Sequence, residues 1–375
     1  MTTPAPAPTP GPGPDAGPAT DPLDLAAEAA LAGPRGANPL VGAAITAPDG
    51  QVIALGHHRG RGTAHAEVDA IAAWHAARGA DPALAALDPA ACTMHVTLEP
   101  CDHTGSTGPC SQAVLAAGFG ALRYAVADPT GTDGGGAARL ARAGVAVAGP
   151  TGHAASERLT ARWRHVRETG RPWVTAHLAQ SLDGQAAAAD GTSRWITGPA
   201  ARAHAHRVRA RVDAIVVGTG TVAADDPRLT ARDEAGADLP VQPVPVVVGR
   251  RDLPASAALA RRPDLIHVRS HNPHEVLAAL AGRPGPWPHG ADRPGHLLIE
   301  GGPHVLGAWC AAGLVDEVFA YTAPLMLGPG LPALAGLPVG TLTDALRWSP
   351  DPAEDGPVRM LGTDVLTHLT PAHPA

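Results

Sequence analysis

In the first half of the chain, short apolar runs alternate with longer stretches whose apolar positions recur at helical spacing. Turn-forming Gly, Pro and Asp bound the short runs, which therefore predict strands at 43–46, 51–55, 93–98, 122–127 and 145–148. The periodic stretches predict helices at 23–32, 64–78, 110–117, 137–143 and 157–168. Thr63 is the expected N-cap of the second helix. Because the run 93–98 is apolar nearly throughout, we expect a sheet that helices cover on both faces.

A second pattern of the same kind begins at Trp173, after a Thr-Gly-Arg-Pro sequence at 169–172. It predicts strands at 174–178, 214–217, 244–248, 265–268 and 297–299, and helices at 200–211 and 305–312. The stretch 283–295, rich in Pro, Gly and His, reads as a surface insertion. Because strands alternate with helices again, we expect a second α/β domain. The predicted organisation is a disordered tail at 1–22, one domain at 23–168, a linker at 169–172 and a second domain at 173–370.

Composition excludes several classes of function. The chain has 375 residues and a net charge of −7, so it lacks the basic field that binding to nucleic acid requires. Its four cysteines are too few for a disulfide framework, which fits a reducing cytoplasm. No apolar run is long enough to span a membrane, and residues 1–22 lack the pattern of a secretory signal. We therefore expect a cytoplasmic protein that binds neither nucleic acid nor membranes.

A candidate metal site lies between residues 65 and 110. His65, Cys101 and Cys110 are the nitrogen and sulfur ligands that a catalytic zinc ion takes from a protein, with water in the fourth position. Glu67 stands two residues after the histidine, where nucleobase deaminases have a proton-carrying glutamate that is not a ligand. Buried cysteines and a core histidine do occur together by chance. A proline before each cysteine, in this order, favours a zinc site with Glu67 as the catalytic acid/base.

One departure from the simple deaminase pattern is the spacing of the two cysteines. Eight residues separate Cys101 from Cys110, where that pattern has two. We expect this longer loop to reach over the substrate.

Two glycine-rich segments follow apolar strands in the second half, at 218–221 and 301–303. Backbone N–H groups at such places can bind phosphate, although a glycine after a strand is more often only a turn. No G-x-G-x-x-G opens a helix here, so the Rossmann fingerprint is absent and a nicotinamide cofactor would need another α/β fold. Asp225-Asp226-Pro227 is typical of a turn and does not by itself indicate catalysis.

From about residue 23 to 370, the order of these motifs resembles the bifunctional riboflavin-biosynthesis deaminase/reductase family. In the first half, the resemblance rests on Asn38-Pro39-x-Val41-Gly42, His65-Ala66-Glu67, Glu99-Pro100-Cys101 and Pro109-Cys110, including the eight-residue gap. In the second half, it rests on Ser181-Leu182-Asp183-Gly184, Trp195-Ile196-Thr197, Gly218-Thr219-Gly220-Thr221-Val222, Ala224-Asp225-Asp226-Pro227, Leu229-Thr230 and Glu300-Gly301-Gly302-Pro303.

The resemblance implies a cytidine-deaminase-like domain followed by a dihydrofolate-reductase-like α/β domain. It also implies two reactions on a pyrimidine ribosyl phosphate: zinc-dependent removal of the 2-amino group, then NADPH-dependent reduction of the ribosyl to a ribityl group. Zn²⁺ and NADPH are the implied cofactors, and a homo-oligomer is the implied assembly. The implied substrate contacts are Asn38, His58, Ser193, Arg209, Leu229, Arg232 and Glu300. The implied cofactor contacts are Gln180, Trp195, Thr197, Thr221, Asp225, Gly302, Pro303, His304, Val305, Leu306, Gly307 and Ala308.

Three positions depart from the family's pattern. Ser106 and His177 stand where the family has a basic residue, and Thr130 replaces an asparagine. Loss of a charge-assisted contact would weaken substrate binding, unless other cations replace it; the candidates are Arg59, Arg61 and His103. These changes keep two alternatives open: a single-activity deaminase, or a paralogue acting on a different pyrimidine. A third alternative is a non-catalytic nucleotide-binding or regulatory protein, but the intact His65, Glu67, Cys101 and Cys110 argue against it.

Overall fold

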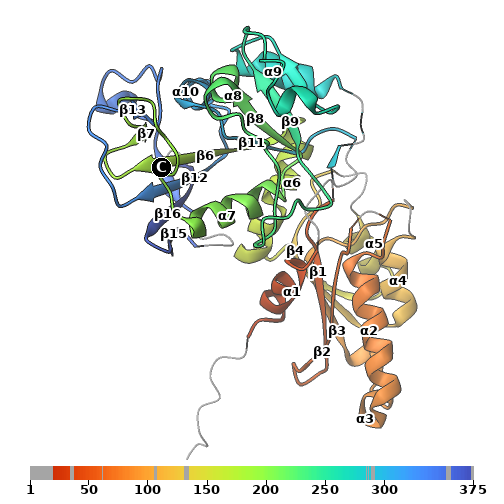
Figure 1. Ribbon diagram of the computed structural model, residues 1–375. Coiled ribbons are helices and arrows are strands. Elements are labelled where there is room, and N and C mark those ends of the chain that lie inside the picture. Colours follow the sequence, from red (N-terminus) through yellow and green to blue (C-terminus); the bar gives the residue numbers. More distant parts are fainter. Residues whose placement is uncertain are drawn as a thin grey trace, which may run out of the picture.

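The chain folds around two separate sheets, which the computed structural model shows as a lower and an upper body (Figure 1). The structure describes residues 20–33, 38–60, 62–104, 108–130, 135–283, 285, 287–288, 292–351 and 356–372. Most of the predicted tail, and parts of the predicted insertion at 283–295, lie outside these residues. Among the helices described, none has the length and apolar character needed to cross a membrane.

The first sheet has five strands in the order β2-β1-β3-β4-β5. Its strands are β1 (Gly42–Thr46), β2 (Val52–His57), β3 (Thr93–Leu98), β4 (Ala121–Val126) and β5 (Ala146–Ala148). β1 runs antiparallel to β2 and to β3, whereas β3, β4 and β5 are parallel. Five of the six residues of β3 are buried, as the apolar run predicted.

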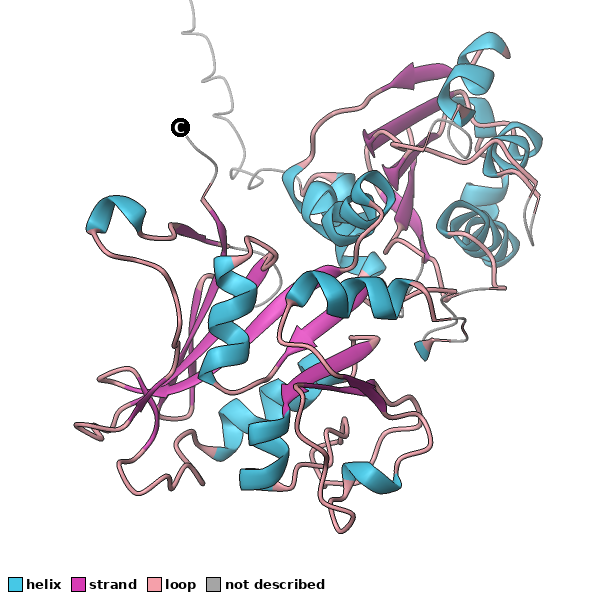
Figure 2. Cartoon of the chain, turned by 90° about the horizontal axis from the view of Figure 1, so that it is seen from above, coloured by secondary structure: helices cyan, strands magenta, loops and turns pink. Residues whose placement is uncertain are grey.

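Helices cover both faces of this sheet (Figure 2). α1 (Pro22–Ala30) and α6 (Ala154–Thr169) pack together on one face. The other face carries α2 (Ala66–Ala80), α4 (Cys110–Ala117) and α5 (Gly136–Arg142), and α2 is followed by α3 (Pro82–Ala85) and the 3-10 turn η1 (Pro89–Ala91). The core beneath α2 and α4 includes Trp74, Met94 and Phe119, all essentially buried.

The second sheet has nine strands, and its main path is β10-β9-β8-β11-β6-β12-β16-β14. The strands are β6 (Trp173–Ser181), β8 (Ala214–Gly218), β9 (Val244–Val248), β10 (Ile266–Val268), β11 (His296–Ile299), β12 (Glu317–Ala323), β14 (Trp348–Pro350), β15 (Val358–Leu361) and β16 (Asp364–Pro371). From β10 to β12 all neighbours are parallel, so their carboxyl ends share one edge. β16 runs antiparallel to β12 and also pairs with β14 and β15. A small separate ribbon pairs β7 (Gln185–Ala187) with β13 (Leu331–Pro332).

Helices also cover both faces of this larger sheet (Figure 2). α7 (Pro199–Arg209) and α8 (Thr219–Asp225) contribute Ala201, Val208 and Val222 to the core on one face. α9 (Pro273–Ala281) and α10 (Pro303–Ala311) contribute Val276, Leu306 and Trp309 to the core on the other. Two 3-10 turns, η2 (Leu259–Arg261) and η4 (Leu342–Asp344), lie in the connecting segments. This arrangement leaves the shared carboxyl edge of the parallel strands open for a ligand.

Two details of the predicted elements are wrong. His65, not Thr63, is the N-cap of α2, because the Thr63 hydroxyl instead donates to the carbonyl oxygen of Gly60 at 2.7 Å. The segment 218–221 is not a loop, since α8 begins at Thr219 directly after β8.

Candidate active sites

The three predicted zinc ligands converge between two helix N-termini and the end of β3. His65 caps α2, Cys110 is the first residue of α4, and Cys101 follows β3 by three residues. Nδ1 of His65 lies 3.2 Å from Sγ of Cys110 and 3.6 Å from Sγ of Cys101. Tetrahedral zinc with ordinary bond lengths separates its nitrogen and sulfur ligands by about 3.5 Å. The donor set and its spacing therefore fit a zinc ion.

Glu67 lies beside this ligand set, in the first turn of α2. Its side chain is 3% exposed, and its carboxyl group is in hydrogen-bonding contact with the Cys110 thiol. Burial raises the pKa of Glu67, so the carboxyl group takes up a proton more readily than an exposed one. A buried carboxyl group of this kind can accept and release a proton next to a metal.

The loop that carries Cys101 is held in place from α4 and α5. Asp102 accepts hydrogen bonds from Ser111 at 2.5 Å and from Arg139 at 2.8 Å. Gly136, at the start of α5, packs so closely that an added Cβ would lie 2.1 Å from the carbonyl oxygen of Pro100. These contacts fix the backbone on both sides of Cys101 and therefore the position of its sulfur atom.

Asn38 and His58, both expected to contact the pyrimidine, are bonded to each other. Nδ1 of His58 lies 3.1 Å from the carbonyl oxygen of Ala64, so this nitrogen is the donor. Nε2 is then an acceptor and takes a hydrogen bond from the Asn38 amide nitrogen at 2.8 Å. This leaves the amide oxygen of Asn38 as the acceptor available to a substrate N–H group.

The cations suggested as replacements for the missing basic residue are not all available. Arg59 donates two hydrogen bonds to Asp69, at 3.2 and 3.3 Å, and is therefore already paired. Ser106 and Arg61 lie outside the described residues. Thr130 donates its hydroxyl to Asp128 at 2.6 Å and closes a local turn.

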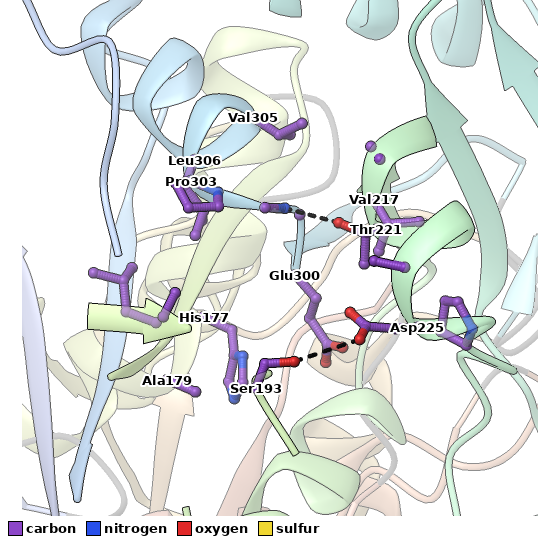
Figure 3. Close-up of a pocket in the computed structure, with 18 of the residues that line it drawn as sticks. His177, Ala179, Ser193, Val217, Thr221, Asp225, Glu300, Pro303, Val305 and Leu306 are labelled. Carbon is purple, nitrogen blue, oxygen red and sulfur yellow. Dashed lines mark hydrogen bonds between the residues drawn. The ribbon is translucent and has the colours of Figure 1, made fainter. Parts of the chain in front are cut away.

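The second site is a cavity of about 1190 Å³ at the carboxyl edge of the large sheet (Figure 3). The segments that follow β8 and β11 form opposite walls, and a hydrogen bond of 3.1 Å from the Gly302 N–H group to the Thr221 hydroxyl joins them. Ser193 donates to Asp225 at 3.5 Å at the lower end of the view, near Glu300 and His177. Polar side chains therefore gather at this end of the cavity.

Arg209 and Glu300 form a bidentate ion pair in the cavity wall, with hydrogen bonds of 2.8 and 2.6 Å. Burial alone would raise the pKa of Glu300, but the charge of Arg209 outweighs it and holds the pKa below its usual value. Arg209 also donates to the carbonyl oxygen of Thr230 at 3.2 Å. A neutralised, rigid pair of this kind can orient a polar substrate.

The cavity gathers most of the residues implied for the reductase. Its lining includes Ser193, Trp195, Thr197, Arg209, Thr221, Asp225, Leu229, Arg232, Glu300, Gly302, Pro303, His304, Val305, Leu306 and Ala308. Two implied cofactor contacts do not line it: Gln180 donates its side-chain amide to Thr322, and Gly307 packs against the backbone of Ala335. Trp195 is exposed and lies against the guanidinium group of Arg202.

Three further lining residues were not predicted as contacts from the sequence. Tyr321 belongs to β12, a strand that the apolar pattern did not reveal, and its hydroxyl group bonds to His204 at 2.7 Å. Arg251 and His271 follow β9 and β10 at the same sheet edge. A basic residue shortly after each of two consecutive predicted strands was a signal that could have found them.

Comparison with known proteins agrees with this two-site architecture. The family model of the cytidine and deoxycytidylate deaminase zinc-binding region matches residues 21–126, and that of the RibD C-terminal domain matches residues 172–349. The chain is 42% identical over 333 residues to a riboflavin biosynthesis protein RibD of Mycobacterium tuberculosis, covering 88% of this chain and 90% of the relative. It is 33% identical over 367 residues to the Escherichia coli K12 protein of that name, covering 89% and 94%.

Solved structures give the same result. A RibD structure from Acinetobacter baumannii superposes with a TM-score of 0.77 at 30% identity, covering 94% of this chain and 98% of that one. A deaminase/reductase from Thermotoga maritima gives 0.76 at 27% identity, with the same coverage. The chain therefore belongs to the RibD family of riboflavin biosynthesis proteins, with a zinc-binding, cytidine-deaminase-like domain followed by a reductase domain of the NADPH-dependent, dihydrofolate-reductase-like kind.

Proposed function

We propose that this chain catalyses two consecutive reactions on one phosphorylated pyrimidine. The first removes the 2-amino group of 2,5-diamino-6-ribosylamino-4(3H)-pyrimidinone 5′-phosphate as ammonia, and the second reduces the ribosyl group of the product to ribityl. The Thermotoga relative is described as a diaminohydroxyphosphoribosylaminopyrimidine deaminase and 5-amino-6-(5-phosphoribosylamino)uracil reductase. The observation that carries the proposal is the presence, in one chain, of the His65–Cys101–Cys110 set with a buried Glu67 and of a large cavity lined by the Arg209–Glu300 ion pair.

In the deaminase half, His65, Cys101 and Cys110 would hold the zinc ion. When bound, zinc lowers the pKa of water, so that hydroxide is available near neutral pH. Glu67 accepts the proton that the water loses and delivers it to the departing amino group. Asn38 presents its amide oxygen to the pyrimidine, and His58 keeps that amide in one orientation. Deamination thus needs only one mobile proton carrier.

In the reductase half, the ion pair of Arg209 and Glu300 holds the sugar and pyrimidine. Ser193, Leu229 and Arg232 complete the substrate side of the cavity. Trp195, Thr197, Thr221, Asp225 and the start of α10 at 302–306 and 308 contact NADPH, whereas Gln180 and Gly307 do not line the cavity. These contacts hold the nicotinamide and the anomeric carbon close together, which is the main protein contribution to a hydride transfer.

The test is to supply the purified chain with the diaminopyrimidine ribosyl phosphate, with and without NADPH, and to identify the products by mass. Without NADPH we expect the deaminated ribosylamino compound and one ammonia per substrate. With NADPH we expect the ribityl compound and one NADPH oxidised per product. Deamination without any reduction would support a single-activity deaminase, and turnover only of a phosphate-free pyrimidine would support a paralogue with a different substrate.

The remaining expectations belong to the same proposal. The chain acts as a homo-oligomer, which light scattering would establish. It works in the cytoplasm, because the thiols of Cys101 and Cys110 must stay reduced to bind a metal. Its two catalytic units meet at 169–172, where α6 ends and β6 begins after a short connection.

A further inference from the structure

His177, in β6, is a histidine of the reductase cavity to which the proposed function gives no role. Its side chain is half-buried and lines the cavity. Figure 3 shows it at one end of the cavity, together with Ser193 and Glu300. In the part of the chain that the structure describes, neither ring nitrogen of His177 forms a hydrogen bond. A neutral imidazole with both nitrogens available can accept a proton at one of them and donate a proton from the other.

The ring of His177 is nevertheless held in one place. Its centroid lies 4.6 Å from the centroid of the Tyr321 ring, and the two ring planes are tilted by 50°. Tyr321 is 1% exposed, and its hydroxyl oxygen lies 2.7 Å from Nδ1 of His204 on α7. The strands that carry the two rings, β6 and β12, are parallel neighbours. The imidazole of His177 therefore has a defined position in the cavity wall.

The other acid–base groups at this end of the cavity are engaged with each other. Arg209 does not give up its proton in a protein, and both carboxylate oxygens of Glu300 accept hydrogen bonds from it, at 2.8 and 2.6 Å. Ser193 donates its hydroxyl group to Asp225 at 3.5 Å. Among these side chains, His177 is therefore the best suited to move a proton.

The surroundings of His177 favour its neutral form. Burial lowers the pKa of His177 below 6.5; the charge of Glu300 opposes this shift, whereas Arg209 and His204 on α7 add to it. Tyr321 on β12 is the further titratable side chain packed against the ring. Near pH 7 the imidazole thus has a lone pair that can accept a proton.

Reduction of a ribosyl group to a ribityl group requires the sugar ring to open. The bond between C1′ and the ring oxygen breaks, its electron pair stays on the oxygen, and the oxygen must receive a proton. The exocyclic nitrogen loses its proton, and the electron pair of that N–H bond forms a double bond to C1′. Opening thus moves one proton from nitrogen to oxygen and consumes neither NADPH nor any other reagent.

Resting on the proposed function, which places the sugar at Arg209 and Glu300, we propose that His177 opens the sugar ring. One nitrogen of the imidazole takes the proton from the exocyclic nitrogen of the substrate, and the other gives a proton to the ring oxygen, so that the imidazole ends neutral. Tyr321 and His204 are positioning residues that hold this imidazole. Because His177 is one of the three departures from the family's pattern, the role belongs to this chain.

Ring opening can be measured without NADPH on the full-length, zinc-loaded chain. Cyanoborohydride reduces an open-chain imine but not the closed aminosugar. With the deaminated ribosylamino compound, the rate at which ribityl product forms, identified by mass, therefore reports opening. The parent should raise this rate above the rate without protein. His177→Gln keeps the hydrogen bonding of the side chain but cannot take up a proton, so it should slow the protein-catalysed opening by a factor of about 10²–10⁴.

Rescue by free imidazole separates proton transfer from a merely structural role. His177→Ala leaves room for imidazole, which should restore opening in proportion to its concentration, whereas His177→Gln should not respond. With NADPH present, both variants should lower kcat for the reduction much more than they raise KM. NADPH binding, measured by calorimetry, should stay at the parent's level and shows that the second body has folded.

The pH profile is a further readout. Because the neutral imidazole accepts the proton, opening by the parent should be constant above pH 6.5 and should fall as the pH drops through the lowered pKa of His177. His177→Ala without imidazole should lack this fall.

His274→Ala is the matched control, because His274 is an exposed histidine on α9 that does not line the cavity. It should leave opening and reduction unchanged. The inference is overturned if the parent does not accelerate opening, if His177→Gln opens the ring at the parent's rate, or if imidazole restores nothing to His177→Ala.

Failure of the proposed function gives a different result. A parent whose ring opening depends on His177, but which never oxidises NADPH with the deaminated compound, would refute the second reaction and support the role of His177. A parent that reduces this compound with NADPH no faster than His177→Gln does would support the function and refute the role.

Discussion

At the scale of single residues, the carboxyl group of Glu67 is the proposed proton carrier of the first site. Glu67→Gln keeps the shape and the hydrogen bonding of the side chain but cannot take up a proton. We expect this variant to bind zinc as the parent does and to lose deamination by a factor of about 10²–10⁴, the usual contribution of a general acid/base. Zinc content by mass spectrometry and ammonia release are the measurements.

The control for this change lies in the same turn of the same helix. Asp69→Asn removes a carboxylate that pairs with Arg59 instead of facing the metal ligands. It should leave ammonia release within a few-fold of the parent. Equal loss in both variants would mean that any acidic residue in this turn matters, and would argue against the role given to Glu67.

The hydrogen bond between Asn38 and His58 makes a second prediction at this scale. If His58 acts through Asn38, then Asn38→Ala and His58→Ala should each lower kcat/KM for deamination while zinc stays bound. The double variant should have a kcat/KM little lower than that of Asn38→Ala, because His58 then has no Asn38 amide to orient. A double-mutant cycle measures this as a coupling energy of about 0.5–3 kcal/mol. Additive losses would mean that the two side chains contact the substrate independently.

Residue type and spacing were enough to predict the metal ligands, because zinc accepts few donors and His65, Cys101 and Cys110 are such donors in the expected order. They were not enough for Asn38 and His58. Both are polar residues near the metal ligands, and only the structure shows that they are hydrogen-bonded to each other. Arg251 and His271 were missed although each follows a predicted strand; the strand order then places these two strands side by side.

At the scale of secondary structure, the start of α5 fixes the loop that follows β3. Gly136→Ala would place a methyl group 2.1 Å from the carbonyl oxygen of Pro100, and backbone must move to relieve that contact. Because Cys101 is the next residue, we expect this variant to bind zinc much more weakly and to lose deamination. NADPH oxidation with the deaminated substrate should persist, because α8 and α10, which border the cavity, lie in the upper body and α5 lies in the lower one (Figure 1).

Gly79→Ala is the control, since Gly79 lies inside α2 with no atom within 4 Å of an added Cβ. It should stabilise the chain by about 0.5–1 kcal/mol, because alanine loses less backbone entropy in a helix. Normal zinc binding by Gly136→Ala would show that the loop tolerates the movement of α5.

Apolar periodicity predicted the strands with continuous buried runs, such as β3, β8 and β9. It did not predict β12 and β16, which form much of the far side of the second sheet. β12 begins with the buried Glu317 and then continues with an apolar run, whereas in β16 polar residues such as the buried His368 alternate with apolar ones. Burial of Glu317 and of His368 is tolerated because the two side chains form a hydrogen bond of 2.8 Å with each other. Because these two residues are 51 positions apart in the sequence, the local pattern of apolar and polar positions does not reveal that they are partners.

At the scale of the whole molecule, Glu317 joins the two bodies. This buried carboxylate accepts hydrogen bonds from Arg162 on α6 at 2.6 Å, from His368 at 2.8 Å and from Thr175 at 2.5 Å. Glu317→Gln would remove the carboxylate that pairs with Arg162 in a poorly hydrated place. We expect a loss of about 3–5 kcal/mol in the free energy of unfolding, measured with urea. Glu157→Gln, an exposed partner of Arg164 on the same helix, should cost less than about 1 kcal/mol.

The same cluster makes stability depend on pH. Burial alone would lower the pKa of His368, but its hydrogen bond to Glu317 and the charge of that carboxylate raise it above 6.5. The charge of Arg162 and the hydrogen bond from His368 overcome burial and hold the pKa of Glu317 well below 4.5. The contribution of His368 to the free energy of unfolding is thus complete below pH 6.5 and is lost as the pH rises through the pKa of His368 in the folded chain. The contribution of Glu317 is complete above pH 4.5 and is lost as the pH falls through its lowered pKa.

The difference in unfolding free energy between the parent and His368→Gln should therefore be largest between about pH 4.5 and 6.5 and should shrink toward alkaline pH. Urea titrations at several pH values measure it. A constant difference across this range would contradict the charged state assigned to His368.

Removal of zinc separates the two activities. A chelator should abolish ammonia release, because His65, Cys101 and Cys110 belong only to the first body. NADPH oxidation with the previously deaminated substrate should continue at the parent's rate, since no residue of this metal set lines the cavity. Loss of both activities would show that zinc also supports the second body.

The contact of α6 with Glu317 bears on how a chain of this kind could evolve. Arg162 precedes the boundary at 169–172, whereas the carboxylate that neutralises it follows that boundary. A gene split at this boundary would place Arg162 and Glu317 on different polypeptides, with His368 remaining beside the carboxylate. Fission into two free-standing enzymes would thus require compensating substitutions at Arg162 and Glu317, so that selection maintains the fusion even if the two catalysts never exchange a molecule directly.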